Sequence, residues 1–316
     1  MRLLTRADFD GLACGTLLDY LGIIDEWEFV HPTDVQNGFV HAMEHDVLAN
    51  IPYIKGCKIW FDHHSSETER LGALFFEKPE PAQKQWEVIK VSWNAPSCAR
   101  VVYEYYRDKN PDKNLERFET MLTYVDKVDS GNLTSDEILN PRGWILLGFI
   151  MDPRTGLGRF AQFNINNMDL MKLLAKACAN MDIDEILALQ DVKERINLYF
   201  EQDKLYRNML QKHIHTEDNV IVLDLRGVNP IYTGNRFIPY TLFPEQNISV
   251  TLLDGNNTDT YTIAVGYSII NKTAAVDVGK LMLKYRGGGH CQVGTCQVSH
   301  TALDEVLKQV LEACKA

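Results

Sequence analysis

Residues 58–64 read Lys-Ile-Trp-Phe-Asp-His-His, an apolar run that ends in an acidic residue and two adjacent histidines. The apolar part, residues 58–61, predicts a buried strand. Ligands of open α/β sheets bind beyond the carboxyl ends of the strands, which is where Asp62, His63 and His64 follow. A single histidine is usually structural, but two together behind an aspartate at a strand end are much less often so. We therefore expect imidazole groups that contact a metal ion and a phosphate, with Asp62 orienting one ring.

A second acidic pattern, Asp8-Phe9-Asp10-Gly11, lies near the start of the chain. It follows an apolar run at residues 2–5 that predicts a strand, and it leads into a helical pattern at residues 11–21. Two close carboxylates at a strand end repel each other, and a divalent cation explains their pairing most simply. Gly11 allows a tight turn of the backbone. Calcium loops and solvated turns also contain this pattern, so by itself it is weak.

A third acidic segment, Val125-Asp126-Lys127-Val128-Asp129-Ser130-Gly131, lies where a predicted helix ends. Acidic, serine and glycine residues commonly terminate helices. The segment alone therefore leaves open whether its aspartates are structural or bind a ligand.

A fourth segment, Arg286-Gly287-Gly288-Gly289-His290, interrupts a helical pattern in the last part of the chain. Three consecutive glycines leave backbone N–H groups that can approach a phosphate closely, with a basic residue on either side. A merely flexible turn would cost conformational entropy without a gain. We therefore predict a phosphate-binding loop, and Arg236 is a further candidate for a basic contact in the same domain.

Short apolar runs alternate with helical patterns through the first half of the chain, which is typical of βαβ units around a mostly parallel sheet. A long polar–apolar period at residues 184–213 lacks glycine and proline and predicts a helix between two domains. The predicted fold class is α/β, with a larger domain at residues 1–190, a connecting helix at 191–214 and a smaller α/β domain at 215–316. Further strands are predicted at residues 27–30, 47–49, 220–225, 248–253, 260–266 and 292–298, and further helices at 98–106, 115–125, 144–150, 277–285 and 303–314.

Composition disfavours several classes of protein. The sequence has no long apolar run, so it predicts neither a secretory signal nor a membrane span. A formal charge of −11 disfavours a protein that grips long nucleic acid. Seven cysteines without a CxxC pair indicate free thiols in a reducing, cytoplasmic compartment. A zinc site at His290, Cys291, Cys296 and His300 is disfavoured because the spacing matches no common zinc module.

The four segments in this order resemble the DHH family of phosphoesterases, and the resemblance covers nearly the whole chain. The family includes the RecJ exonuclease, nanoRNA and phosphoadenosine phosphatases, cyclic dinucleotide phosphodiesterases and exopolyphosphatase-like proteins. Within the family, this sequence is most similar to the exopolyphosphatase-like branch. Each segment alone is weak, but the ordered set is specific.

The resemblance implies a role for each matching residue. His63 matches a metal-binding histidine, His64 a histidine that contacts the substrate phosphate, and Asp62 a residue that orients a ring. The implied acidic metal ligands are Asp8, Asp10 and Asp129. The implied substrate-binding loop comprises Gly287, Gly288, Gly289 and His290, with Arg286 beside it. Manganese in a two-ion site is the usual cofactor of the family, and magnesium is an alternative.

The sequence departs from the family pattern on one side of the implied metal site. Arg6 stands where a histidine is usual, and Asn50 stands where an aspartate should follow the third strand, which begins at Asp46. Either Asn50 or Asp46 would have to supply the remaining metal ligand. A guanidinium has no lone pair for a metal ion. We therefore predict one well-formed metal site, from Asp10, His63 and Asp129, and a second that is weakened, absent or replaced by Arg6.

These inferences predict a metal-dependent hydrolase of phosphate esters or phosphoanhydrides. Its substrate would be a short oligonucleotide, a phosphonucleotide, a linear dinucleotide or polyphosphate, and its compartment the cytoplasm. The alternative is a phospholigand-binding or regulatory protein of the same fold that has lost efficient chemistry, for which Arg6 and Asn50 are the evidence. A homodimer is the commonest default for such a protein.

Overall fold

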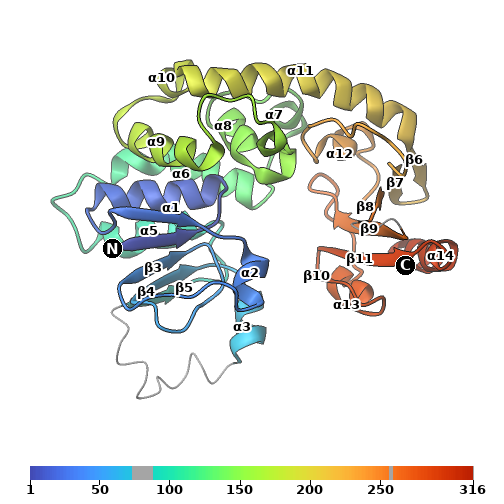
Figure 1. Cartoon of the computed structure of the whole chain (residues 1–316), viewed down its shortest axis with the longest axis horizontal. Helices are drawn as coiled ribbons and strands as arrows, with labels where there is room; N and C mark the ends of the chain where they lie inside the picture. The colour runs from blue at the N-terminus through green and yellow to red at the C-terminus, as the bar shows by residue number, and fades with distance from the viewer. Residues whose placement is uncertain (73–87, 256–258, 316) are drawn as a thin grey trace. The chain divides into compact units, whose positions relative to one another are not determined.

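The computed structural model describes residues 1–72, 88–255 and 259–315. The chain forms two compact units (Figure 1). The first comprises Met1–Asn132 and Pro141–Asn197, and the second comprises Leu133–Asn140 and Leu198–Ala316. Among the described residues, no helix is both long and apolar enough to cross a membrane.

The first unit is built on a sheet of five parallel strands in the order β2-β1-β3-β4-β5. This order confirms the α/β fold class and the parallel sheet predicted for the first half of the chain. β3 and β4 are buried along their whole length, which explains their uninterrupted apolar character. The strands are β1 Arg2–Thr5, β2 Glu26–Phe29, β3 Asp46–Ala49, β4 Ile59–Asp62 and β5 Val88–Val91.

Helix α1 (Phe9–Tyr20) is the central helix of this unit. Its residues from Phe9 to Leu18 are all buried, and it packs against β1 and four neighbouring helices (Figure 1). A helix that is covered on most sides has no separate polar face, so its apolar residues are not confined to one stripe. The other helices of the unit are α2 Pro32–Gln36, α3 Ser66–Leu71, α5 Cys98–Arg107, α6 Glu119–Asp129, α8 Gly143–Met151, α9 Asn167–Asn180 and α10 Ile183–Ala188. Its 3-10 turns are η2 Glu116–Phe118, η3 Pro153–Thr155 and η4 Leu157–Arg159.

The opposite face of the sheet is covered by a second apolar cluster. Leu4, Leu48 and Trp60 from three neighbouring strands pack there against Val35 of α2 and Leu71 of α3. The sheet is therefore enclosed on both faces, and its edge at the carboxyl ends of the strands is left for polar residues.

The second unit contains a six-stranded mixed sheet in the order β10-β11-β9-β8-β7-β6. Only β7 and β8 are parallel. Two helices, α13 and α14, supply the apolar side chains that cover one face of this sheet. The strands are β6 Ile214–Glu217, β7 Val220–Asp224, β8 Ile248–Asp254, β9 Thr260–Tyr267, β10 Gly288–His290 and β11 Val293–Ser299. The helices are α7 Ser135–Leu139, α12 Ile238–Leu242, α13 Val278–Leu283 and α14 Leu303–Lys315.

The long helix predicted at residues 184–213 is two helices. α10 ends at Ala188, and α11 (Gln190–His213) begins after Leu189, whose backbone is extended at ψ 137°. The polar–apolar period continues through this break, so periodicity alone does not reveal it. The boundary between the two compact units falls within α11, after Asn197.

Candidate functional site

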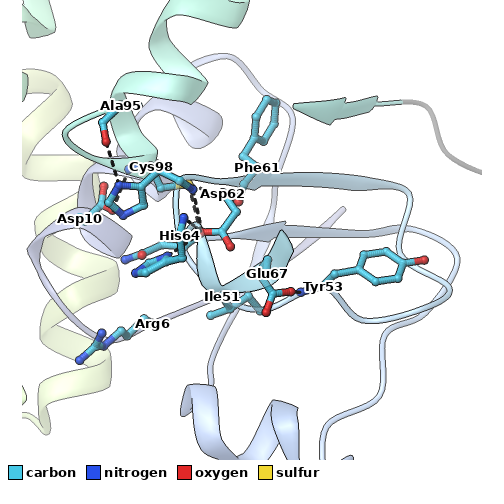
Figure 2. A network of polar contacts seen from close by, with 12 residues as sticks. Arg6, Asp10, Ile51, Tyr53, Phe61, Asp62, His64, Glu67, Ala95 and Cys98 are labelled. Atoms are coloured by element: carbon cyan, nitrogen blue, oxygen red, sulfur yellow. Dashed lines mark hydrogen bonds and ion pairs between the residues drawn. The ribbon is translucent and has the colours of Figure 1, made fainter. Parts of the chain in front are cut away.

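Polar side chains from three neighbouring strands meet at the carboxyl edge of the first unit's sheet. Arg6 follows β1, Asn50 follows β3, and His64 follows Asp62 at the end of β4. Figure 2 shows Arg6, Asp10, Asp62 and His64 at this edge. The structure thus brings together the DxDG and DHH segments, which are separated by about fifty residues in the sequence.

Asp10 is held by the amino terminus of helix α5. Its two carboxylate oxygens accept the backbone N–H groups of Cys98 at 2.9 Å and Ala99 at 2.8 Å. These donors and the helix dipole favour its charged form. Burial and the nearby carboxylates of Asp129 and Asp8 act more strongly, and they raise the pKa of Asp10 well above its ordinary value. The carboxylate is therefore held firmly in place, close to two other carboxylates.

His63 faces two of these carboxylates with an unpaired nitrogen. Its Nε2 lies 3.7 Å from Asp10 Oδ2 and 3.3 Å from Asp129 Oδ2. The ligand atoms of all three residues lie within 4.8 Å of one another. Nδ1 of His63 lies 3.1 Å from the carbonyl oxygen of Ala95, to which it donates when it carries the proton. In that tautomer Nε2 presents a lone pair, and it is buried with no hydrogen-bond partner among the described residues.

This arrangement fits a divalent cation. A lone pair that faces two carboxylates is unfavourable unless a positive charge lies between them. Carboxylate and imidazole groups both bind divalent cations, and neighbouring octahedral ligands at metal distances of ~2.1 Å lie roughly 3 Å apart, close to the spacings found here. Burial also raises the pKa of Asp129, against an opposing effect of His63. The unpaired nitrogen of His63 thus indicates a place for a cation.

Asp8 has different surroundings, although the resemblance placed it among the metal ligands. Its Oδ1 accepts the backbone N–H of Gly11 and the side-chain amide of Asn50, each at 3.0 Å. Its Oδ2 forms an ion pair with Nε of Arg6 at 3.0 Å. Both oxygens therefore already have donors from the protein. The two residues that depart from the family pattern, Arg6 and Asn50, are the ones that engage Asp8.

Gly11 is required by the close approach of the β1–α1 turn. A Cβ atom at this position would lie 2.0 Å from the carbonyl oxygen of Arg6, a distance that no side chain tolerates. The turn that carries both Arg6 and Asp8 therefore depends on glycine.

Asn50 is fixed by its own backbone and by the loop that follows it. Its φ of 58° is in the left-handed region, which asparagine adopts more readily than most residues. The loop beyond it is tied to α3, because Tyr53 N–H donates to Glu67 Oε2 at 2.9 Å (Figure 2). Arg70 Nη2 also donates to the Tyr53 carbonyl. The amide of Asn50 is thereby kept against Asp8.

His64 is oriented by Asp62. Its Nδ1 lies 2.7 Å from Asp62 Oδ1, which also accepts the backbone N–H of His63 at 2.8 Å. Burial lowers the pKa of His64, but its hydrogen bond to Asp62 and the surrounding carboxylates outweigh burial and raise the pKa to about 9. A protonated His64 keeps Nε2 as a second hydrogen-bond donor.

Two aspartates that the sequence left as alternatives lie elsewhere. Asp46 is at the start of β3, at the opposite end from Asn50. Its carboxylate accepts hydrogen bonds from Nε of Arg2 at 3.0 Å and from the backbone N–H of Met43 at 2.7 Å. Asp126 accepts Ser97 Oγ at 2.6 Å and the guanidinium of Arg100, so it joins α6 to α5. Neither carboxylate belongs to the three-residue cluster.

The glycine segment of the second unit forms an edge strand. Gly288–His290 is β10, which pairs with β11. A Cβ on Gly287 would lie 2.1 Å from the Thr295 carbonyl oxygen, and Gly289 has a φ of 154° and the same conflict with Val293 at 2.2 Å. A Cβ on Gly288 would meet nothing within 4 Å. Two glycines are thus explained by strand packing, and Gly288 has no such structural need.

Two basic residues of the second unit, Arg286 and Arg236, take part in local structure. Arg286 has a φ of 60° in the turn that follows α13 and its cap Lys284. The N–H of Gly287 donates to the Met282 carbonyl at 2.9 Å, as in a helix-terminating turn. Arg236 lies over the ring of Phe237, 4.4 Å from its centroid. Arg286 and His290 are exposed. Contact of these residues with a substrate stays a prediction.

Sequence patterns did not reveal one basic residue of the site, Arg154. It lines a pocket together with Asp8, Asp10 and Asp129, and it follows α8 in the short turn η3. An isolated arginine in an irregular segment carries no periodicity or motif, so only the fold places it here.

Several solved structures resemble this chain. A pGpG-specific phosphodiesterase from Vibrio cholerae is 40% identical, with a TM-score of 0.83, over 98% of this chain and 97% of that chain. An exopolyphosphatase-related protein from Bacteroides fragilis is 12% identical, with a TM-score of 0.53, over 99% of this chain and 92% of that one. RecJ from Thermus thermophilus, in complex with Mn²⁺, is 13% identical, with a TM-score of 0.53, over 100% of this chain and 52% of that one. No protein-family model and no curated protein matches the sequence.

Proposed function

Because the chain belongs to the DHH family of phosphoesterases, we propose that it hydrolyses the linear dinucleotide pGpG or a close analogue, with release of mononucleotides. The chain is a hydrolase of phosphoester bonds in small phosphorylated substrates. The dinucleotide and the identity of the metal are the finer parts of this proposal.

The observation that carries the proposal is the similarity to the pGpG-specific phosphodiesterase along nearly the whole of both chains. At 40% identity, both the catalytic unit and the glycine-rich unit have counterparts there. The net charge of −11 also suits a substrate of two nucleotides better than a long strand, whose binding depends on many phosphate contacts.

We propose that one divalent cation, manganese or magnesium, binds between Asp10, His63 and Asp129. The buried and unpaired Nε2 of His63 supports this assignment. When bound, such an ion supplies Lewis acidity toward a phosphate oxygen and lowers the pKa of a coordinated water. Asp8 is not counted as a ligand, since Arg6, Asn50 and Gly11 already engage its oxygens.

The remaining polar residues act on the phosphate. Asp62 keeps the Nδ1 proton of His64 in place and so aims Nε2 at the phosphate oxygens, where it donates a charge-assisted hydrogen bond. Arg6 supplies positive charge where a second ion is usual in the family, and it neutralises charge that develops on the phosphoryl group. The Ala95 carbonyl holds the tautomer of His63 that leaves Nε2 available.

We also propose that the protein works in the cytoplasm. All seven cysteines are free, and six of them are buried. Burial raises the pKa of the Cys98 thiol to about 12, so this thiol stays protonated and unreactive. Such thiols suit a reducing compartment.

A panel of substrates tests the proposal. Purified protein with Mn²⁺ is incubated with pGpG, a longer RNA oligonucleotide, a 3′-phosphonucleotide and polyphosphate, and released mononucleotide or phosphate is measured. We expect the highest kcat/KM for pGpG and no turnover after chelation of the metal. Preference for polyphosphate or for the longer RNA would overturn the dinucleotide assignment.

A further inference from the structure

Arg154 is fixed close to the proposed metal ligands by the packing of α8. A Cβ on Gly148 would lie 2.9 Å from the ring of Phe9 and 3.4 Å from Val128, so only glycine lets α8 approach α1 and α6 this closely. Phe9 also stacks on Trp144 of α8, with ring centroids 6.3 Å apart. α1 carries Asp10 and α6 ends at Asp129. The segment after α8 is therefore anchored to the two elements that supply the carboxylates.

Asp152 orients the guanidinium of Arg154. Its Oδ1 accepts the backbone N–H of Arg154 at 2.8 Å and Nε at 2.7 Å, and its Oδ2 lies 3.0 Å from the same Nε. Only Nε of the guanidinium is used in this way. In the part of the chain that the structure describes, neither terminal NH₂ group of Arg154 has a hydrogen-bond partner.

The pocket around this guanidinium is rich in carboxylates. Asp8, Asp10, Asp129 and Asp152 line it together with Arg154. Burial alone would lower the pKa of Arg154, but these neighbours raise it, with Asp152 first and Asp8 and Asp129 after it. The guanidinium thus remains charged, and two NH₂ groups are free beside the residues that would hold a cation.

We propose that Arg154 binds the phosphate undergoing hydrolysis through its two terminal NH₂ groups, and that Asp152 positions it for this contact. A planar guanidinium matches two oxygens of a phosphate, and a fixed one loses little entropy on binding. The assignment rests on the proposed function, since it takes the phosphate of that reaction as its ligand. Arg154 is then a second arginine at the phosphate. The first is Arg6, which lies in the turn after β1 and forms an ion pair with Asp8.

The test compares Arg154→Ala and Arg154→Lys with a matched control, Arg159→Ala. Arg159 lies five residues further on, in η4, and does not line the pocket. For each Mn²⁺-loaded variant, kcat and KM on pGpG, the Mn²⁺ affinity and the binding of GMP are measured, and thermal unfolding checks the fold. GMP binding reports the phosphate contact even if the true substrate is not pGpG.

We expect Arg154→Ala to lower kcat/KM by about 100-fold and to weaken GMP binding, with Mn²⁺ affinity and unfolding temperature unchanged. Arg154→Lys should recover part of the loss, because it keeps the charge but not the paired donors. Equal losses in Arg159→Ala, or GMP binding that is unaffected in Arg154→Ala, would overturn the proposal. If the wild type fails to hydrolyse pGpG, the proposed function falls, and the GMP comparison alone decides the role of Arg154.

Discussion

Asp126 and Asp129 lie one turn apart on α6, yet their partners differ. Asp126 accepts hydrogen bonds from Ser97 and Arg100, whereas Asp129 faces Nε2 of His63. We predict that Asp129→Asn abolishes Mn²⁺ binding while the fold persists. Asp126→Asn should instead keep Mn²⁺ binding and lower the free energy of unfolding by about 1–3 kcal/mol, through loss of a charged hydrogen-bond partner. Calorimetric Mn²⁺ titration and urea unfolding of both variants separate these outcomes, and the reverse pattern would exchange the two roles.

Arg6 provides the second test at the residue scale. We expect Arg6→Ala to lower kcat/KM by about 100-fold, because a fixed positive charge on the phosphoryl group is lost. Arg6→Lys should lose less, and Mn²⁺ should still bind at Asp10, His63 and Asp129. Unchanged kinetics in Arg6→Ala would show that the guanidinium serves only to hold Asp8.

Individual side chains were predictable where a motif fixed their place. Asp10 lies in the first turn of the helix after β1, His63 follows β4, and Asp129 ends α6, so each belongs to a recognisable motif. Arg154 has no such neighbour pattern, and its position depends on how closely Gly148 lets α8 pack. The engagement of Asp8 by Asn50 was also not predictable, since it depends on a left-handed backbone conformation at one residue.

At the scale of elements, the β10–β11 pair allows structural and binding roles of glycine to be separated. Gly287→Ala places a Cβ against the Thr295 carbonyl oxygen, and we expect it to destabilise the second unit by about 1–3 kcal/mol. Gly288→Ala has open space and should leave stability unchanged. If Gly288 contacts the substrate phosphate, Gly288→Ala should nonetheless raise KM for pGpG. Equal destabilisation by both substitutions would contradict the packing described here.

Strands with an apolar run or a clear alternation of apolar and polar residues were predictable, and strands without such a pattern were not. The strands at β1, β3, β4 and β8 coincide with apolar or alternating runs. β5 is short and only half-buried, and β6 contains two exposed polar residues, so neither shows a pattern. The break at Leu189 was missed because one extended residue does not disturb the polar–apolar period around it.

At the scale of the whole molecule, the two compact units should respond differently to metal. All three proposed ligands belong to the first unit, so Mn²⁺ should stabilise that unit by about 2.7 kcal/mol at a concentration 100 times its dissociation constant. We expect calorimetry to show this shift in the transition of the first unit, and Asp10→Ala to eliminate it. A shift that persists in Asp10→Ala would place the metal elsewhere.

One of the two compact units is built from segments that are far apart in the sequence. Leu133–Asn140 belongs to the second unit, although the segments on either side of it belong to the first. Its helix α7 packs against α12, about a hundred residues later, and Asn235 donates to the Ile138 carbonyl at 3.4 Å. Such a contact depends on tertiary packing, and the local sequence pattern of an eight-residue segment does not predict it.

The most direct test of the account is Mn²⁺-dependent release of GMP from pGpG, measured in the wild type and in Asp10→Ala. If Asp10, His63 and Asp129 form the one metal site, turnover by the wild type saturates with a single Mn²⁺ per chain, and Asp10→Ala shows none at the same metal concentration. Turnover that survives in Asp10→Ala, or that needs two ions per chain, would contradict a single site formed by Asp10, His63 and Asp129.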